Sequence, residues 1–215
     1  MQYISINRRK ECLPVIMGRS KTSFVLKRCF DVIFSALGIF FLSPLYLLIL
    51  IALLIQGRGS VIYRQERIGL NGKAFNILKF RTMIECAEKN GPQLEIANDP
   101  RLTIVGKFLR KHHLDELPQL FNVLTGDMSL VGYRPERQFF IEQIMEKDSR
   151  YECLYQMRPG LTSEATLYNG YTNSIEKMLE RLNMDLRYLE RGTLKTDLKI
   201  IFSTIKLIVL GDKTL

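Results

Sequence analysis

The 215-residue sequence contains no tryptophan and only two histidines. Without tryptophan, a Trp belt at a membrane interface cannot form. His112 and His113 are adjacent, so on a helix they point about 100° apart and cannot make one metal site by themselves. The four cysteines show neither C-x-x-C spacing nor a histidine at metal spacing, which argues against a zinc site and predicts reduced thiols.

The sequence also lacks internal repeats, low-complexity tracts and a linker between domains, so we expect one domain with appendages. Its 31 Lys and Arg against 22 Asp and Glu give a formal charge of +9. That excess suits an anionic membrane surface, phosphorylated substrates or nucleic acid. Because the basic residues are scattered among apolar segments and no common binding-module signature is present, nucleic acid is disfavoured.

Residues 32–55 form a long uncharged run, which as a straight helix would extend about 36 Å, enough to span a bilayer. Ser43-Pro44 lies in its middle, where the proline must break a backbone hydrogen bond. Basic residues flank both ends, which favours a re-entrant helix that enters, bends and leaves on the same face. A Pro-kinked spanning helix stays open as the alternative. The preceding residues 1–26 are polar and basic and lack a signal-peptide cleavage site.

Beyond the apolar run, the sequence predicts a β-hairpin followed mainly by helices. Residues 61–64 alternate weakly, Asn71-Gly72 is a strong turn signal, and residues 74–80 supply the return strand. Helices are expected at residues 102–113, 135–149, 175–191 and 195–210. The last is amphipathic and would either lie in the membrane interface or cover the core.

Residues 114–136 read L-D-E-L-P-Q-L-F-N-V-L-T-G-D-M-S-L-V-G-Y-R-P-E and set Asp115 and Glu116 beside a helix start. If Asp115 caps that helix, Pro118 falls in its first turn and the free N–H groups face anions. If the preceding basic helix runs through instead, Pro118 kinks it beside Asp115. A short strand is expected at residues 128–131, and Pro135 holds Arg134 in extended geometry suited to clamping phosphate.

The pattern D-E-L-P-Q-L-F-N-V-L-x-G-D-M-S-L-V-G-x-R-P closely resembles the bacterial sugar transferases called monotopic phosphoglycosyl transferases. The resemblance covers the chain from about Lys27 to its C-terminus. It implies transfer of a sugar 1-phosphate from a nucleoside diphosphate sugar, expected to be a UDP-sugar, to undecaprenyl phosphate with release of UMP. This would be the first membrane step in assembling an exopolysaccharide, capsule, O-antigen or glycoprotein glycan.

The resemblance also assigns roles to residues. Asp115 would attack phosphorus to form a glycosyl-phosphoryl aspartate, and direct transfer without a covalent intermediate stays open as the alternative. Glu116 would hold Mg²⁺, and Arg134 with Arg110 and Arg158 would neutralise charge. Substrate-binding positions are implied by the R-P-G-L-T loop and the K-F-R-T-M motif, namely Arg158, Pro159, Gly160, Thr162, Lys79 and Arg81. The chain departs from the family pattern at Tyr133 and Ser163, which puts in doubt the hold on Arg134 and the nucleotide or sugar preference.

We therefore predict a mixed α/β, mostly α, monotopic membrane protein. Its parts are a basic tail (1–26), a re-entrant helix broken at Ser43-Pro44 (27–57), and a catalytic domain with interfacial amphipathic helices (58–215). The expected location is the bacterial inner membrane with the catalytic domain on the cytoplasmic face, and a homo-oligomer is compatible with the sequence. The competing hypothesis is a non-catalytic, membrane-docked sugar-nucleotide sensor or scaffold, which would not need Asp115 and Glu116.

Overall fold

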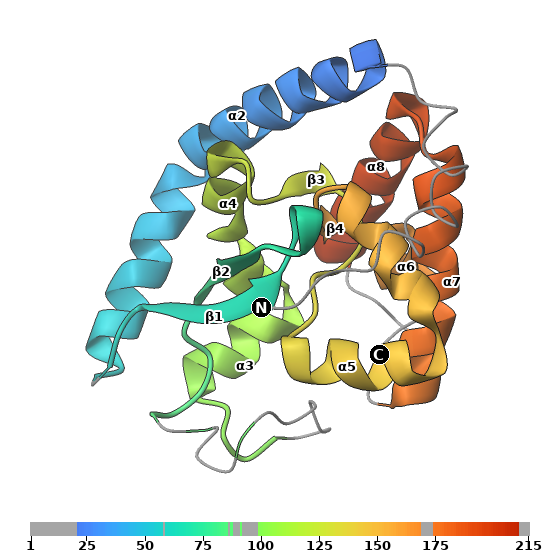
Figure 1. The fold of residues 1–215 in the computed structure, drawn as a ribbon. Helices are drawn as coiled ribbons and strands as arrows, with labels where there is room; N and C mark the ends of the chain where they lie inside the picture. The colour runs from blue at the N-terminus through green and yellow to red at the C-terminus, as the bar shows by residue number, and fades with distance from the viewer. Residues whose placement is uncertain are drawn as a thin grey trace.

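The computed structural model describes residues 21–57, 59–85, 87, 91, 99–168 and 174–210. Most of them lie in helices that surround two small sheets (Figure 1). The predicted fold class is thus confirmed at the level of a mostly helical chain with a small β-hairpin and one long apolar N-terminal helix. Of the predicted basic tail, residues 1–20 lie outside the described part.

Helix α2 (Lys21–Ile55) contains Pro44 and is long and apolar enough, by length and composition, to cross a membrane. It stays one helix through Ser43-Pro44 but changes direction along its length (Figure 1). Pro44 has no N–H to donate to the carbonyl of Phe40, and the Ser43 hydroxyl donates to that carbonyl at 2.8 Å. The predicted break is therefore a bend whose freed carbonyl is satisfied, while re-entry itself stays a prediction.

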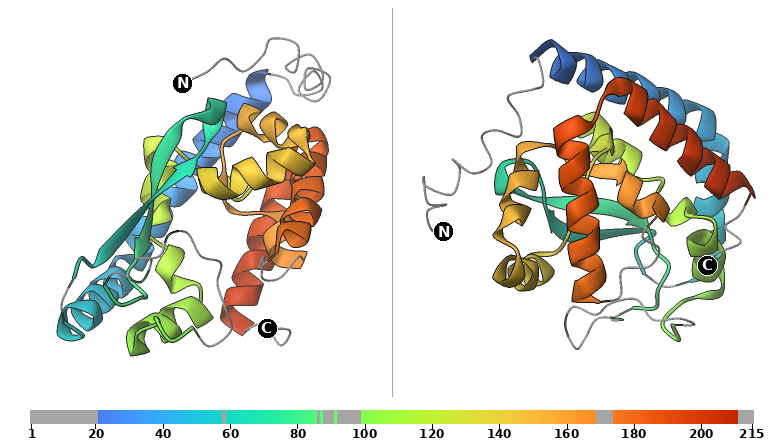
Figure 2. Two further views of the ribbon diagram at one scale, coloured as in Figure 1. Left: turned by 60° about the horizontal axis from the view of Figure 1, so that its bottom comes forward. Right: turned by 90° about the vertical axis from the view of Figure 1, so that its right-hand side faces the viewer.

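Large apolar side chains of α2 remain exposed, among them Phe40 and Phe41 at 71% each and Ile55 at 80%. A continuous apolar face of this size is unfavourable in water and marks a membrane-associated surface. Helix α8 (Leu194–Leu210, red in Figure 2) contacts the first part of α2 through Asp197 and Lys27, and exposes Phe202 and Ile205. Since Ile200 of α8 is buried, this helix covers the core with one side and presents apolar groups on the other.

The first part of α2 is anchored to the rest of the molecule by polar contacts. Lys27 pairs with the Asp197 carboxylate of α8 at 2.6 Å, and the buried Asp31 accepts a hydrogen bond from the Leu130 amide at 3.1 Å. Arg28 donates to the carbonyls of Val123 and Leu124 at 2.7 and 3.0 Å. These contacts fix α2 against α8, against strand β3 (Ser129–Val131) and against the C-terminal end of helix α4 (Gln119–Thr125).

Strands β1 (Ile62–Ile68) and β2 (Ala74–Phe80) form the predicted antiparallel hairpin, with Ile62 opposite Phe80 and Ile68 opposite Ala74. The short 3₁₀ turn η1 (Leu70–Gly72) connects them. Asn71 and Gly72 both have positive φ there, 57° and 71°, which Asn and Gly tolerate best. The turn signal in the sequence is confirmed.

Strands β3 (Ser129–Val131) and β4 (Gly160–Thr162) pair in parallel and form a second sheet. Just after β3, Gly132 meets the start of β4 so closely that a Cβ on Gly160 would lie 2.1 Å from the Gly132 nitrogen. Only glycine fits such a backbone contact. It fixes the loop that carries Arg134 against the loop that begins at Arg158.

The other elements close around a main core. They are α3 (Ile104–Lys111), η2 (Leu114–Glu116), α4 (Gln119–Thr125), α5 (Gln138–Lys147), η3 (Ser149–Gln156), α6 (Glu164–Tyr168) and α7 (Ile175–Arg191). That core includes Met128, Tyr133, Ile141, Leu154 and Leu182. A second cluster joins Ile49 and Leu53 of α2 to Phe80 and Leu109. Helix α5 begins later than predicted because Arg137 is extended, with φ −77° and ψ 146°.

Of the two cysteines in the described ranges, one contradicts the expectation of reduced thiols. Cys29 on α2 is a free, exposed cysteine. Cys153 in η3 is disulfide-bonded. Cys12 and Cys86 lie outside the described residues.

Candidate active site

The backbone that carries the two acids takes neither of the predicted paths. Helix α3 ends at Lys111, His113 turns the chain with a left-handed φ of 52°, and Asp115 and Glu116 lie in the 3₁₀ turn η2. Helix α4 starts only at Gln119, so Asp115 does not cap it and α3 does not run through. The expectation of an unusual backbone at the acids is confirmed, whereas the capping role is wrong.

Asp115 and Glu116 lie in contrasting electrostatic surroundings. The Asp115 side chain is buried, and burial raises the pKa of its carboxyl, with Lys79 acting in the opposite direction. For Glu116, burial also acts to raise the pKa, but Lys79 and Arg134 together hold it below its ordinary range. The Lys79 ammonium lies 2.7 Å from the Glu116 carboxylate and the Arg134 guanidinium 3.6 Å from it. Asp115 is thus the less stabilised carboxylate of the pair.

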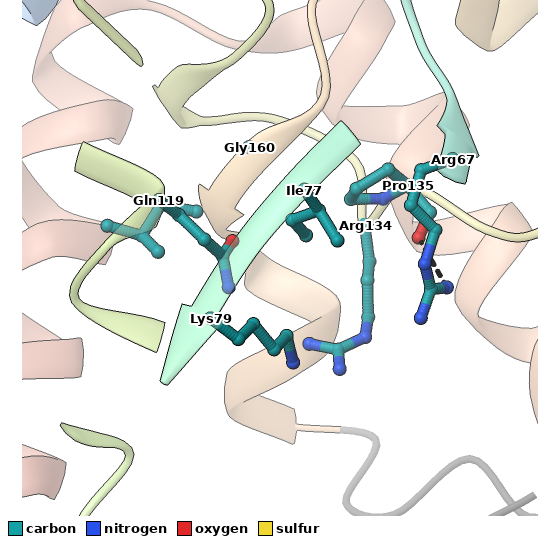
Figure 3. A pocket seen from close by; sticks show the side chains of 8 residues that line it. Arg67, Ile77, Lys79, Gln119, Arg134, Pro135 and Gly160 are labelled. Carbon is teal, nitrogen blue, oxygen red and sulfur yellow. Dashed lines mark hydrogen bonds between the residues drawn. The ribbon is translucent and has the colours of Figure 1, made fainter. Parts of the chain in front are cut away.

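A small pocket lies beside Glu116, where Lys79 of β2 and Arg134 of the loop after β3 bring their charged ends toward each other (Figure 3). Its lining comprises Arg67, Ile77, Lys79, Gln119, Arg134, Pro135, Gly160 and Leu161. Three cationic side chains around one hollow favour an anion with several oxygens, such as a phosphate group.

The loop of Arg134 is fixed by ion pairs that Glu136, two residues later, makes with two arginines. Glu136 lies between Arg67 of β1, at 3.3 Å, and Arg181 of α7, at 2.6 Å. Arg67 also donates to the Pro135 carbonyl at 3.0 Å, the contact drawn in Figure 3. Charged partners therefore fix both residues that follow Arg134.

The structure brings some of the predicted site residues together and leaves others apart. Asp115, Glu116, Lys79, Arg134 and Gly160 lie in or beside the pocket. Arg110 of α3 donates to the Thr82 hydroxyl at 3.0 Å, and its charge still acts on the Asp115 carboxyl.

Among the other predicted substrate-binding residues, several make structural contacts. Arg81 donates to the carbonyls of Leu53 and Gly57, at 3.0 and 2.9 Å, and so closes the C-terminal end of α2. Arg158 donates to the Gly126 carbonyl at 2.8 Å, at the end of α4. The Thr162 hydroxyl meets that of Thr204 on α8, and the Pro159 carbonyl accepts from the Ser129 amide. Substrate binding by these four residues stays a prediction.

Arg67, Gln119 and Glu136 are the residues that the sequence prediction did not place in the site. Gln119 lines the pocket, and its buried side-chain nitrogen has no hydrogen-bond partner among the described residues. Its position directly after D-E-L-P was the available signal, as was that of Glu136 after R-P. Arg67 lies in the first strand of the hairpin, where an arginine cannot be distinguished by sequence from a solvated strand residue.

Within the described ranges, no group of three or more His, Cys, Asp or Glu side chains is arranged to hold a metal ion. Glu116 offers one carboxylate, and a hard cation such as Mg²⁺ is commonly held by one or two carboxylates together with substrate phosphates. The donor set therefore fits Mg²⁺ only jointly with a phosphorylated substrate.

Comparison with known proteins adds independent information. Residues 22–211 match the family model described as "Bacterial sugar transferase". A UDP-N-acetylgalactosamine-undecaprenyl-phosphate N-acetylgalactosaminephosphotransferase of Aeromonas hydrophila is 36% identical over 86% of this chain and 44% of its own length. A UDP-glucose:undecaprenyl-phosphate glucose-1-phosphate transferase of Caulobacter vibrioides is 41% identical over 86% of this chain and 70% of its own. Exopolysaccharide production protein ExoY of Sinorhizobium fredii is 38% identical, with 87% of each chain covered. The chain spans less than half the length of several curated relatives that it matches.

Proposed function

Because the chain belongs to the bacterial sugar transferase family, we propose that it transfers a sugar 1-phosphate from a UDP-sugar to undecaprenyl phosphate and releases UMP. The observation that carries this proposal is the buried Asp115 carboxyl next to a pocket lined by Lys79 and Arg134. A buried carboxylate that is poorly stabilised is a reactive nucleophile, and the cations beside it suit a diphosphate.

The proposed reaction has two displacements at one phosphorus atom. An Asp115 oxygen attacks the sugar-linked phosphorus, the bond to the bridging oxygen breaks, and its electron pair leaves with UMP. An oxygen of undecaprenyl phosphate then attacks the same phosphorus and releases the Asp115 carboxylate. Arg134 and Lys79 neutralise the charge on the phosphoryl oxygens as they transfer.

Mg²⁺ is part of the proposal through Glu116. The residue would hold the cation together with phosphate oxygens, and Lys79 would then give up its present 2.7 Å contact with the carboxylate. The cation would supply charge neutralisation at the diphosphate. Removal of divalent ions by a chelator is expected to stop UMP release, and added Mg²⁺ to restore it.

The membrane part of the proposal is a re-entrant α2 in the bacterial inner membrane, with the catalytic domain on the cytoplasmic face. The bend of α2 supports it, as do the polar anchors Lys27, Arg28 and Asp31, which tie the first part of the helix to the same domain as its end. With the catalytic domain on the cytoplasmic face of the membrane, Asp115 would lie within reach of a lipid phosphate at that face. This topology makes both ends of the chain cytoplasmic.

The decisive experiment for the reaction is intact-protein mass spectrometry after rapid acid quench. Wild-type protein with the correct UDP-sugar and Mg²⁺, but no lipid, should gain one sugar phosphate on the peptide that contains Asp115. Asp115→Asn should keep the fold and lose both adduct and turnover. Asp127→Asn, a matched change at an exposed turn, should keep both. Normal turnover with repeated absence of the adduct would rule out the covalent route.

Topology is tested separately with single cysteines near residues 5 and 212, in a background that lacks the native cysteines. Both positions should be shielded from a membrane-impermeant thiol reagent in intact cells and react after permeabilisation. Labelling of the first position from outside would sink the re-entrant proposal. Replacement of Ser43 and Pro44 by leucine should increase that outside-labelled form.

A further inference from the structure

We propose that Tyr46 of the membrane helix is a positioning residue for the catalytic turn. Its hydroxyl donates a hydrogen bond of 2.6 Å to the Leu117 carbonyl, directly after Glu116 in the chain. Tyr46 is not among the residues that line the pocket, so it would act through the backbone that carries the acids. Its expected effect on kcat rests on the proposed function, whereas its expected effect on the conformation of the turn does not.

The Tyr46 ring is enclosed by the elements that build the acid side of the pocket. Its centroid lies 5.6 Å from that of Phe80 on β2 and 6.1 Å from that of Phe121 on α4. Leu114 and Leu117 of the catalytic segment belong to the same apolar cluster. The ring therefore holds the hydroxyl in one place relative to both the hairpin and the turn.

The turn itself has little internal support. Its backbone hydrogen bonds are long, 3.4 Å from the Glu116 amide to the His113 carbonyl and 3.3 Å from the Leu117 amide to the Leu114 carbonyl. Pro118 has no N–H to donate, and His113 is held in a left-handed conformation that a non-glycine residue rarely adopts. The Leu117 carbonyl, at the end of this segment, accepts from the Leu120 amide at 3.0 Å and from the Tyr46 hydroxyl at 2.6 Å. The hydroxyl is the donor that comes from outside the segment, and it therefore helps to fix the orientation of both acids.

Tyr46 also links the acids to the bend in α2. It follows Pro44 by two residues, while Arg28, before the bend, binds the carbonyls at the other end of α4. In a straight helix the Cα atoms of residues 28 and 46 would be about 27 Å apart, whereas Leu117 and Leu124 are separated by only about 10 Å of helix. The bend turns the second part of α2 around α4, so both contacts can form at once (Figure 1).

The first test compares two Tyr→Phe variants. Tyr46→Phe keeps the ring contacts and removes the hydroxyl; we expect kcat to fall about five- to tenfold while KM for the UDP-sugar changes less than twofold. Tyr188→Phe removes a buried hydroxyl that donates to Asp197, away from the turn, and should lower the melting temperature without lowering kcat. Wild-type kcat in Tyr46→Phe, or equal loss of kcat in both variants, would overturn the proposal.

The second test is a double-mutant cycle with Pro44→Ala, which restores an N–H donor to the Phe40 carbonyl and straightens α2. If the bend acts on the acids through Tyr46, Pro44→Ala and Pro44→Ala/Tyr46→Phe should have the same kcat. Losses that multiply would show that the bend and the hydroxyl act independently.

Hydrogen exchange separates failure of this inference from failure of the proposed reaction. Tyr46→Phe should speed exchange of the amides of residues 114–120, and Tyr188→Phe should not. This holds even if wild-type protein releases no UMP from any UDP-sugar, a result that would refute the reaction alone. Unchanged exchange in Tyr46→Phe would refute the positioning role whatever the activity.

Discussion

The turn that carries Asp115 and Glu116 lies beside the pocket and packs against α2; we call it the acid wall. The loop of Arg134, which lines the pocket and is called the arginine wall, packs against β4 and α7. The backbone of the acid wall is held by apolar contacts and by the Tyr46 hydroxyl, while its Glu116 side chain pairs with Lys79 and Arg134. The arginine wall is held by buried ion pairs to Glu136 and by the Gly132–Gly160 backbone contact.

This difference predicts that substitutions in the two walls change different quantities, the free energy of unfolding in one and the reaction rate in the other. Buried charges that lose one partner are costly, so changes behind the arginine wall should act on stability first. The acid wall carries the buried Asp115 carboxyl, whose pKa burial raises, so changes there should act on the reaction first. The predictions below test that division.

The largest effect is expected behind the arginine wall, at Glu136. Glu136→Gln leaves Arg67 and Arg181 buried without their carboxylate and should lower the free energy of unfolding by about 3–5 kcal/mol. Denaturant unfolding of detergent-purified protein measures it. Glu142→Gln, on the exposed side of α5, is the matched control and should change stability by less than about 0.5 kcal/mol. Equal behaviour of the two variants would contradict the division.

Next in size is the contribution of Arg134 itself, which faces the pocket rather than the core. Arg134→Lys keeps the charge but not the planar fork, and should lower kcat roughly a hundredfold, about 3 kcal/mol in the barrier. The melting temperature should stay that of the wild type. A lysine variant with near wild-type kcat would assign Arg134 a structural role.

Within the acid wall, the two neighbouring carboxyls should affect stability in opposite directions. The folded-state pKa of Asp115 is raised, so its ionised form costs stability at neutral pH, and that cost is relieved as the pH falls through this pKa. The folded-state pKa of Glu116 is lowered, so its charge adds stability that is lost as the pH falls through it.

Asp115→Asn should therefore raise the melting temperature at pH 7, and Glu116→Gln should lower it. A change of about 1 kcal/mol corresponds to roughly 2–4 °C for a chain of this size. Calorimetry at neutral pH checks both signs. Two upward shifts would mean that burial governs both groups, and two downward shifts that the cation partners do.

The smallest expected effect is a displacement of the pH profile. Adduct formation requires ionised Asp115, so its acid limb should lie above the ordinary aspartate pKa of about 3.9. Lys79 lowers the pKa of Asp115, so Lys79→Gln should move the limb to still higher pH. Quenched-flow measurement of the adduct between pH 4 and 8 would detect it, and a limb that moves to lower pH would reverse the assignment.

Local patterns predicted the elements of this fold well. The 175–191 helix, the return strand 74–80 and the turn at Asn71-Gly72 depend on periodicity and turn chemistry, which neighbouring residues determine. The acid pair and Arg134 were predicted from one continuous motif, and they do lie together.

What the sequence could not predict depends on partners far along the chain. Arg81 binds carbonyls of residues 53 and 57, and Arg158 binds that of Gly126, although each stands in a motif that suggested phosphate. A guanidinium satisfies a helix end as well as an anion, so residue type does not distinguish the two. The path at His113 likewise depends on packing around the turn rather than on capping propensity.

The polar contacts of α2 also constrain the order in which parts of the chain can fold during synthesis. Lys27 pairs with Asp197, which is synthesised 170 residues later, about 10–30 s at ordinary elongation rates. During that interval Lys27 lacks its Asp197 partner, and Asp31, one helical turn away, offers the opposite charge. Moving this charged pair into the hydrocarbon core of a membrane would be costly. We therefore expect the first turns of the nascent helix to stay outside the hydrocarbon until the C-terminal part of the chain has folded.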